Sequence, residues 1–227
     1  MRVKLYKAFT QNPLEGNPAG VIFNADELTV EQMIEIANEL GFSESAFIVK
    51  PTDKAAYRFR FMTPTQEVDA CGHATLAASK AILDIESFEK LSIQTNAGIV
   101  EISVVKYRIM MKMAKAEINE TNYEKEDIAK LLNINPDEIL DLPIVTASVG
   151  SPKLIIPIKS LSTVQSIKSN FDAMIEFCGK HPVKGFYPFT TETINKDADF
   201  HARQFNPAAG IFEDPITGIA AGALALY

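Results

Sequence analysis

The sequence contains only two cysteines, Cys71 and Cys178, and its three histidines are widely separated along the chain. Two cysteines do not make a disulfide-stabilised scaffold, so we expect reduced thiols and a cytoplasmic location. The CxxC and HExxH patterns that often bind metals are also missing. The sequence therefore predicts no metal site.

Basic residues and long apolar segments are scarce as well. Lys and Arg total 22 against 29 Asp and Glu, a net charge of −7 at pH 7, which argues against nucleic-acid binding. No apolar run approaches the length of a membrane span, and residues 3–9 alternate like a strand instead of resembling a signal peptide. Hydrophobic residues make up 47% of the chain, which is the composition of an ordinary globular enzyme.

The elements that we expect along the chain suggest two domains. Apolar residues at helical spacing predict a helix from Glu31 to Leu40 that ends at Gly41, and a second, almost wholly apolar helix from Ala74 to Leu83. Strand-like segments surround both helices. The polar stretch from Lys115 to Lys125 is the best linker candidate, so we predict domains at residues 1–114 and 115–227.

One pattern occurs twice, once in each predicted domain. Each copy has a strand end, a proline-marked loop, a reactive side chain, a glycine and an Ala-rich helix. The copies are Phe61-Met62-Thr63-Pro64 with Cys71-Gly72-His73-Ala74-Thr75, and Phe205-Asn206-Pro207 with Asp214-Pro215-Ile216-Thr217-Gly218. Exposed N–H groups at the start of a helix attract anions. Two such segments aimed at one place would form a cleft for a substrate carboxylate.

Three residues of the first domain are candidates for acid–base chemistry. Glu44 precedes an apolar strand, where partial burial would raise its pKa and suit a general base; the alternative is a surface glutamate. Cys71 precedes a helix whose start would favour the thiolate, although a buried packing role is commoner for cysteine. His73 could bind a carboxylate or move a proton, or it could only cap the helix.

Other polar residues have both a functional and a purely structural interpretation. Asp214, before Pro215, occupies the place of the reactive residue in the second copy, yet Asp before Pro often only starts a turn. Asn17 lies in what reads as a tight turn from Gly16 to Gly20, where its amide could bind a ligand. Arg203 could pair with an internal acid or steady the second loop.

Together these residues resemble the PhzF-like family of phenazine biosynthesis proteins, which has the diaminopimelate epimerase fold. The segments that carry the resemblance are Ala8-Phe9-Thr10, Gly16-Asn17-Pro18-Ala19-Gly20-Val21, Ser43-Glu44-Ser45-Ala46-Phe47, Phe61-Met62-Thr63-Pro64, Asp69-Ala70-Cys71-Gly72-His73-Ala74-Thr75, Arg203-Gln204-Phe205-Asn206-Pro207 and Glu213-Asp214-Pro215-Ile216-Thr217-Gly218. They follow one another in order over nearly the whole chain.

The resemblance implies an α+β fold of two similar domains, each a mostly antiparallel β-roll around a central helix, with the second domain short at its C-terminal end. It implies a homodimer, no cofactor, and a small carboxylate-bearing substrate bound between the domains, with no nucleic-acid or membrane partner. The implied catalytic residues are Glu44, His73 and Asp214. The substrate-binding positions are Asn17, Cys71, Gly72, Thr217 and Gly218.

The first functional hypothesis is a cofactor-independent isomerase of a biosynthetic process. Glu44 would take a proton from carbon and return it elsewhere, while His73 and Asp214 orient the substrate or relay protons. Related racemases use two facing cysteines; Cys71 fits the first place but Asp214 stands at the second, which disfavours a two-thiol mechanism.

The alternative is a catalytically impaired, truncated paralogue that acts as a dimeric metabolite- or protein-binding module. Ile219 favours it, because the family usually has a serine after the second glycine, and so does the end of the chain at Tyr227. The apolar segment from Gly218 to Tyr227 would leave an exposed patch on a monomer, so a homodimer or larger assembly is expected.

Overall fold

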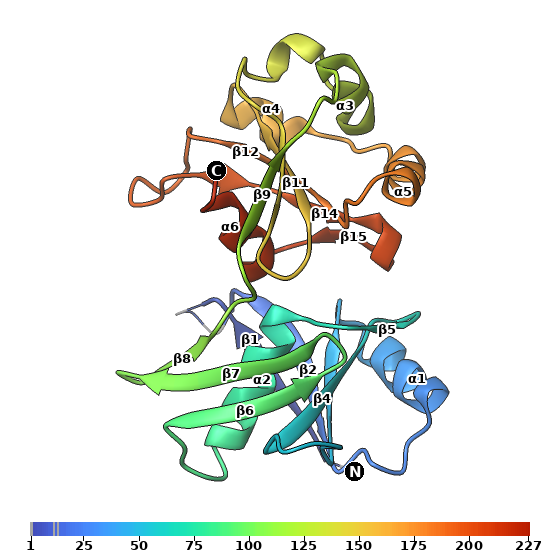
Figure 1. Cartoon of the computed structure of the whole chain (residues 1–227), viewed down its shortest axis with the longest axis vertical. Helices are drawn as coiled ribbons and strands as arrows, with labels where there is room; N and C mark the ends of the chain where they lie inside the picture. Colours follow the sequence, from blue (N-terminus) through green and yellow to red (C-terminus); the bar gives the residue numbers. More distant parts are fainter. Residues whose placement is uncertain (1, 11, 13) are drawn as a thin grey trace. The chain divides into compact units, whose positions relative to one another are not determined.

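The chain folds into two compact units, Met1–Met113 and Ala114–Tyr227, each with its own sheet (Figure 1). The structure is a computed structural model that describes residues 2–10, 12 and 14–227; Met1, Gln11 and Pro13 lie outside the described residues. Both units combine a mostly antiparallel sheet with a few helices, which confirms the predicted α+β fold class. Among the described residues, no helix is both long and apolar enough to cross a membrane.

The first unit contains one sheet with the spatial order β1-β2-β3-β4-β6-β7-β8 and with β5 beside β4. Its strands are β1 (Arg2–Ala8), β2 (Asn17–Phe23), β3 (Ser45–Val49), β4 (Tyr57–Met62), β5 (Glu67–Val68), β6 (Lys90–Thr95), β7 (Gly98–Val105) and β8 (Arg108–Met111). Among the described strands of this unit, the β2–β3 and β4–β6 pairs alone are parallel. The two parallel pairs flank the β3–β4 hairpin, and β3 follows Glu44 directly.

The sheet curls around helix α2 (Gly72–Leu83), because β1 and β8, at opposite ends of the strand order, both contact this helix. The helix presents small side chains on several sides, and Ala74, Ala77, Ala78 and Ala81 are all buried. They pack with larger strand residues such as Phe59 in one apolar core. Alanine suits this position because it favours the helix and lets the surrounding strands approach closely.

Helix α1 (Val30–Leu40) covers the other face of the sheet through Met33 and Ala37. It begins with a capping box between Thr29 and Gln32 and ends at Gly41, which has a positive φ of 68°. This end was predicted, because glycine adopts the left-handed conformation that terminates helices. The chain then needs only a short link to reach β3, and Glu44 is the last residue of that link.

The second unit has a sheet of the order β15-β14-β12-β11-β10-β9, with β13 beside β12 and a parallel β11–β12 pair. Its strands are β9 (Glu117–Glu120), β10 (Val145–Ser148), β11 (Lys153–Pro157), β12 (Phe186–Thr190), β13 (His201–Ala202), β14 (Gln204–Asn206) and β15 (Ile211–Asp214). Its helices are α3 (Lys125–Leu132), α4 (Leu161–Ser166), α5 (Phe171–Lys180) and α6 (Gly218–Leu224), with short 3-10 turns at η1 (Pro136–Glu138) and η2 (Pro207–Ala209).

Alternate residues of β11 and β12 serve two different cores in this unit. Ile156 and Phe186 pack with helices α3, α4 and α5, whereas Ile155 and Tyr187 pack with α6. This is the alternation of side chains across a strand. Helix α6 buries one side on the sheet and leaves Ala221 exposed, so part of this apolar segment is open to solvent in the single chain.

The polar stretch that we predicted to be a linker contains a strand. Residues 117–120 form β9, which pairs in antiparallel fashion with β10. All four of its side chains are exposed. An edge strand is held by backbone hydrogen bonds to one neighbour and needs no apolar alternation of its own, so the polar composition concealed it.

We predict that Gly20→Ala destabilises the protein by about 1–3 kcal/mol, because added atoms strain a packed core. Gly20 lies opposite Ser45 in the β2–β3 pair, and a Cβ there would be 2.7 Å from Leu40 Cδ1 and 2.9 Å from Ser45 Oγ. The matched control is Gly179→Ala in α5, where a Cβ meets no atom within 4 Å and the better helix propensity should raise stability slightly. Urea unfolding of both variants tests this; equal midpoints would contradict it.

Candidate active site

Four of the predicted site residues meet in the first unit, near the start of α2. Glu44 precedes β3, Asn17 begins β2, Cys71 is the N-cap residue of α2, and His73 lies in its first turn. All four side chains are buried, with exposed fractions of 8%, 1%, 6% and 4% respectively. Polar side chains are seldom buried so deeply unless they contact one another, and these do.

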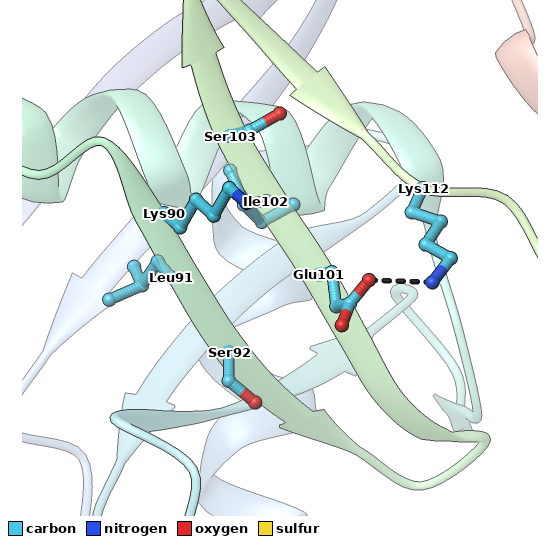
Figure 2. A pocket seen from close by; sticks show the side chains of 7 residues that line it. All are labelled: Lys90, Leu91, Ser92, Glu101, Ile102, Ser103 and Lys112. Atoms are coloured by element: carbon cyan, nitrogen blue, oxygen red, sulfur yellow. Dashed lines mark hydrogen bonds and ion pairs between the residues drawn. The ribbon is translucent and has the colours of Figure 1, made fainter.

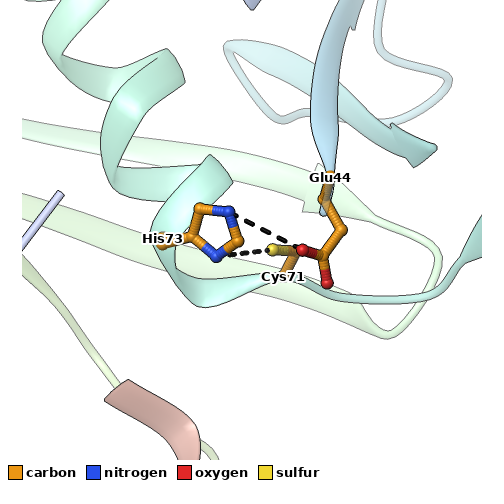
Figure 3. A group of neighbouring side chains, drawn as sticks. All are labelled: Glu44, Cys71 and His73. Atoms are coloured by element: carbon orange, nitrogen blue, oxygen red, sulfur yellow. Dashed lines mark hydrogen bonds and ion pairs between the residues drawn. The ribbon is translucent and has the colours of Figure 1, made fainter. Parts of the chain in front are cut away.

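The imidazole of His73 is the centre of this group. Its Nε2 lies 3.7 Å from Glu44 Oε2, and its Nδ1 lies 3.3 Å from Cys71 Sγ and 3.3 Å from Asn17 Nδ2. Figure 3 shows the ring nitrogens turned toward Glu44 and Cys71. The histidine therefore links the carboxylate, the thiol and the amide in one cluster.

Burial lowers the pKa of His73 to about 4, and the backbone of Pro18 acts weakly in the opposite direction. The imidazole is therefore neutral at pH 7, so its contact with Glu44 is not an ion pair there. Nδ1 lies within hydrogen-bonding distance of both the Asn17 amide and the Cys71 thiol, and Nε2 faces Glu44 at 3.7 Å, so the tautomer decides which of these neighbours meets the ring proton.

Local backbone structure fixes these side chains. Cys71 is extended, with φ −146° and ψ 115°, and its carbonyl accepts hydrogen bonds from the backbone N–H and the hydroxyl of Thr75. Asn17 follows Gly16, whose φ is +87° and whose added Cβ would be 2.5 Å from the Ala8 carbonyl oxygen. The tight turn predicted for residues 16–20 is therefore wrong beyond Gly16, because Asn17 already begins β2.

Glu44, Cys71 and His73 are also the donor types that zinc uses, and their ligand atoms lie within 4.8 Å of one another. A zinc ion held there would occupy the atoms that a proton transfer needs. The same three side chains therefore cannot serve both purposes at once.

The remaining predicted residues belong to the second unit. Asp214 ends β15, opposite Gln204 of β14. The neighbouring Arg203 donates hydrogen bonds of 2.6 and 2.7 Å to the carboxylate of Glu213 and further ones to the carbonyl oxygens of Val164 and Ile167. Arg203 therefore pairs with an acid, but with an exposed one rather than the internal acid expected, and it anchors the strand that carries Asp214.

The structure changes the correspondence between the two repeated segments. Thr217 is the N-cap residue of α6, directly before Gly218, with φ −129° and ψ 115°. These angles nearly equal those of Cys71, and neither side chain makes a capping hydrogen bond. Thr217, rather than Asp214, is therefore the backbone equivalent of Cys71. The sequence suggests Asp214 because its side chain is the more reactive one. The residue directly before the glycine, however, is the one that the two segments share in backbone structure.

Sequence reasoning missed Tyr187 of β12. This side chain is buried, and burial, together with the charge of Asp214, raises its pKa to about 12. Its hydroxyl therefore stays protonated near Asp214. The only signal in the sequence is an aromatic residue in a strand, which usually means a core position.

A separate hollow lies over β6 and β7 of the first unit (Figure 2). It contains an ion pair of 2.7 Å between Lys112 and Glu101, and both side chains are mostly exposed. Exposed pairs of this kind contribute little binding energy because water and salt screen them. The hollow therefore lacks the buried polar groups that distinguish the cluster around His73.

The comparisons with known proteins agree with this fold. The family described as phenazine biosynthesis-like protein, PhzC-PhzF, matches residues 6–227. An uncharacterized isomerase of Clostridium acetobutylicum is 39% identical over 97% of this chain and 76% of its own length, and one of Bacillus subtilis is 36% identical over 98% and 78%. A PhzF-family phenazine biosynthesis protein of Bacillus anthracis is 32% identical, with a TM-score of 0.87 over 99% of this chain and 79% of that chain.

The fold and the relatives thus define an isomerase-like enzyme with a two-domain, diaminopimelate epimerase-like architecture. The chain belongs to the PhzC-PhzF family of phenazine biosynthesis-like proteins.

We predict that His73 makes folding stability depend on pH. Between about pH 4 and 6.5 the folded protein keeps His73 neutral, whereas the unfolded chain protonates it. Stability is therefore lost as the pH falls through this window, by roughly 3 kcal/mol in total. Urea unfolding between pH 7 and 4 should show a smaller loss for His73→Asn than for the unchanged protein. Identical pH dependence would contradict a buried neutral histidine.

Proposed function

We propose that the protein is a cofactor-independent isomerase that moves a proton on a small carboxylate-bearing metabolite. Glu44 takes a proton from a carbon next to a carbonyl or unsaturated group and becomes a neutral carboxylic acid. The electron pair of the broken C–H bond is delocalised into that neighbouring group. Return of the proton to a different carbon, or to the other face of the same carbon, completes the reaction without oxidation or reduction.

The observation that carries this proposal is a buried carboxylate beside a buried, neutral imidazole. An ionised Glu44 can accept a proton, and in its Nε2–H tautomer the neutral His73 can donate a hydrogen bond from the same side without carrying a positive charge. A group that donates while neutral can stabilise developing negative charge on a substrate. The backbone N–H groups at the start of the twelve-residue helix α2 add to this stabilisation.

Asp214 is proposed to take part in the same reaction, as the resemblance implies. Its neighbour Tyr187 remains protonated, and so the pair offers one acceptor and one donor. Cys71 is proposed to contact the substrate without acting as a base. The position equivalent to it carries a threonine, and a hydroxyl cannot replace the second thiol of a two-cysteine racemase.

We predict that Glu44→Gln abolishes proton transfer and preserves the fold, because glutamine has the shape of glutamate but cannot take up the proton. General acid–base groups typically contribute about 10²–10⁴-fold in rate. Incubating the protein with small carboxylic acids in D₂O and following deuterium incorporation by NMR measures this directly. A Glu44→Gln variant that washes in deuterium at the original rate would assign the base elsewhere.

Cys71→Ala is the matched comparison for Glu44→Gln, because Cys71 is buried in the same cluster. If the thiol only packs and contacts substrate, this variant should lose much less activity than the roughly 10²–10⁴-fold typical of a proton-transferring group. A loss as large as that of Glu44→Gln would indicate thiol chemistry.

The protein is also proposed to be a homodimer. Static light scattering at micromolar concentration should then give twice the chain mass of 25.0 kDa. A monodisperse monomer would overturn this proposal and would leave the isomerase chemistry untouched.

A further inference from the structure

The side chains of Glu44, Cys71 and His73 form the one group, in the part of the chain that the structure describes, where three zinc-type donors lie close together. One carboxylate oxygen, the thiol sulfur and one imidazole nitrogen all lie within 4.8 Å of one another (Figure 3). The proposed reaction gives the sulfur no chemical step of its own. The sequence contains no metal-binding motif here because Glu44 joins the other two residues only through the fold.

The spacing of these atoms is close to that of a tetrahedral zinc site. Zn–S bonds of about 2.3 Å and Zn–N or Zn–O bonds of about 2.1 Å, at tetrahedral angles, place the ligand atoms about 3.4–3.6 Å apart. His73 Nδ1 is 3.3 Å from Cys71 Sγ, and His73 Nε2 is 3.7 Å from Glu44 Oε2. Because a histidine binds one zinc ion through one nitrogen, closing all three ligands around the ion needs a movement of about 1 Å in one side chain.

The start of helix α2 holds two of the three ligands in place. The Cys71 carbonyl oxygen accepts hydrogen bonds from the backbone N–H of Thr75 at 3.0 Å and from its hydroxyl at 2.7 Å. His73 lies in the first turn of the same helix, and the Asn17 amide is 3.3 Å from its Nδ1. Ligands that are already positioned lose little conformational freedom when an ion binds, so this geometry favours binding.

The donor types determine which ion fits. A thiolate, an imidazole and a carboxylate suit Zn²⁺, whereas Mg²⁺ and Ca²⁺ prefer a full set of oxygen ligands. Three protein ligands leave the fourth position of zinc for a water molecule. The Glu44 side chain keeps 11% of its surface exposed, so the cluster reaches solvent through its carboxylate, and an ion is much smaller than a substrate.

We propose that Glu44, Cys71 and His73 form a zinc site that switches off the proposed proton transfer. Zn²⁺ binds the sulfur, one ring nitrogen and the carboxylate; the thiol proton passes to solvent as the Zn–S bond forms, and no electron is gained or lost. While the ion is bound, the Glu44 oxygen that would accept a substrate proton is a metal ligand. The metal site rests on the geometry, whereas its inhibitory effect rests on the proposed function.

Cobalt(II) is the probe for this site, because Co²⁺ replaces zinc at such ligands and a cobalt–thiolate bond absorbs in the near ultraviolet. The protein is treated with EDTA, freed of chelator and titrated with CoCl₂ under reducing conditions. One equivalent of Co²⁺ should produce the thiolate band. ZnCl₂ should then remove the band by displacing cobalt, since zinc binds such ligands more tightly, and MgCl₂ should leave it unchanged. Competition with a chelating dye gives the Kd for zinc.

Cys71→Ser should abolish the thiolate band, whereas Cys178→Ser, the matched control at the other cysteine, should keep it. Glu44→Gln and His73→Asn should each weaken zinc binding by at least about 100-fold, more than the roughly 10–100-fold typical of replacing a residue behind a metal ligand. A band that survives in Cys71→Ser, or a zinc Kd that is unchanged in Glu44→Gln, overturns the proposal.

X-ray absorption by zinc in the unchanged protein tests the ligand set without any substitution. The proposed site requires one sulfur at about 2.3 Å and nitrogen or oxygen ligands at about 2.0–2.2 Å. A zinc ion with no sulfur neighbour, or with two, overturns the assignment. This measurement therefore decides even if Cys71→Ser does not fold.

Zinc added to the deuterium-exchange assay separates this proposal from the proposed function. Zn²⁺ should stop deuterium incorporation at concentrations that fill the site, and EDTA should restore it. If zinc binds these three ligands while exchange continues at its original rate, the metal site stands, but the switch and the role of Glu44 as the base both fail. If zinc stops exchange and the thiolate band is absent, the metal site fails. The cobalt spectrum needs no substrate, so it decides on the site even when no tested acid exchanges deuterium.

Discussion

The architecture of the first unit depends on the burial of α2 inside its curled sheet. A helix surrounded on several sides can be packed at close range only if its side chains are small, and alanine at positions 74, 77, 78 and 81 meets that condition. The same burial removes water from the start of the helix. His73 lies in that first turn, so the packing that holds the fold together also sets the chemistry of the histidine.

The neutral state of His73 follows from this packing and determines what the cluster can do. A protonated imidazole would form a strong ion pair with Glu44, and a carboxylate engaged in that pair would be a weaker base. The neutral ring forms no ion pair with Glu44 and lies with Nε2 3.7 Å from its carboxylate. The removal of His73 from water therefore favours the proposed role of Glu44 as a general base. In most protein cores, removing a polar group from water only lowers stability.

The sequence predicted the features that depend on local patterns. The apolar helix over 74–83, the end of α1 at Gly41 and the grouping of Glu44 with Cys71 and His73 all rest on short-range signals or on ordered family motifs. The sequence did not reveal features that depend on pairing between segments far apart in the chain. Strand β9 exists because β10 offers it hydrogen bonds, which the polar composition of residues 117–120 does not reveal.

The two repeated segments show how one backbone arrangement can carry different chemistry. Cys71 and Thr217 have nearly the same backbone angles and each precedes a glycine that begins a helix. The side chains around them differ. In the first segment the His73 imidazole lies 3.3 Å from the Cys71 thiol and 3.7 Å from the Glu44 carboxylate. In the second segment Tyr187 lies near Asp214. The repeat therefore preserves the way in which a helix start is presented, while the reactive groups come from neighbouring strands. A symmetric pair of thiols would need cysteine at both N-caps, and this chain has a threonine hydroxyl at one of them, which supports the proposal that Glu44 takes up the proton.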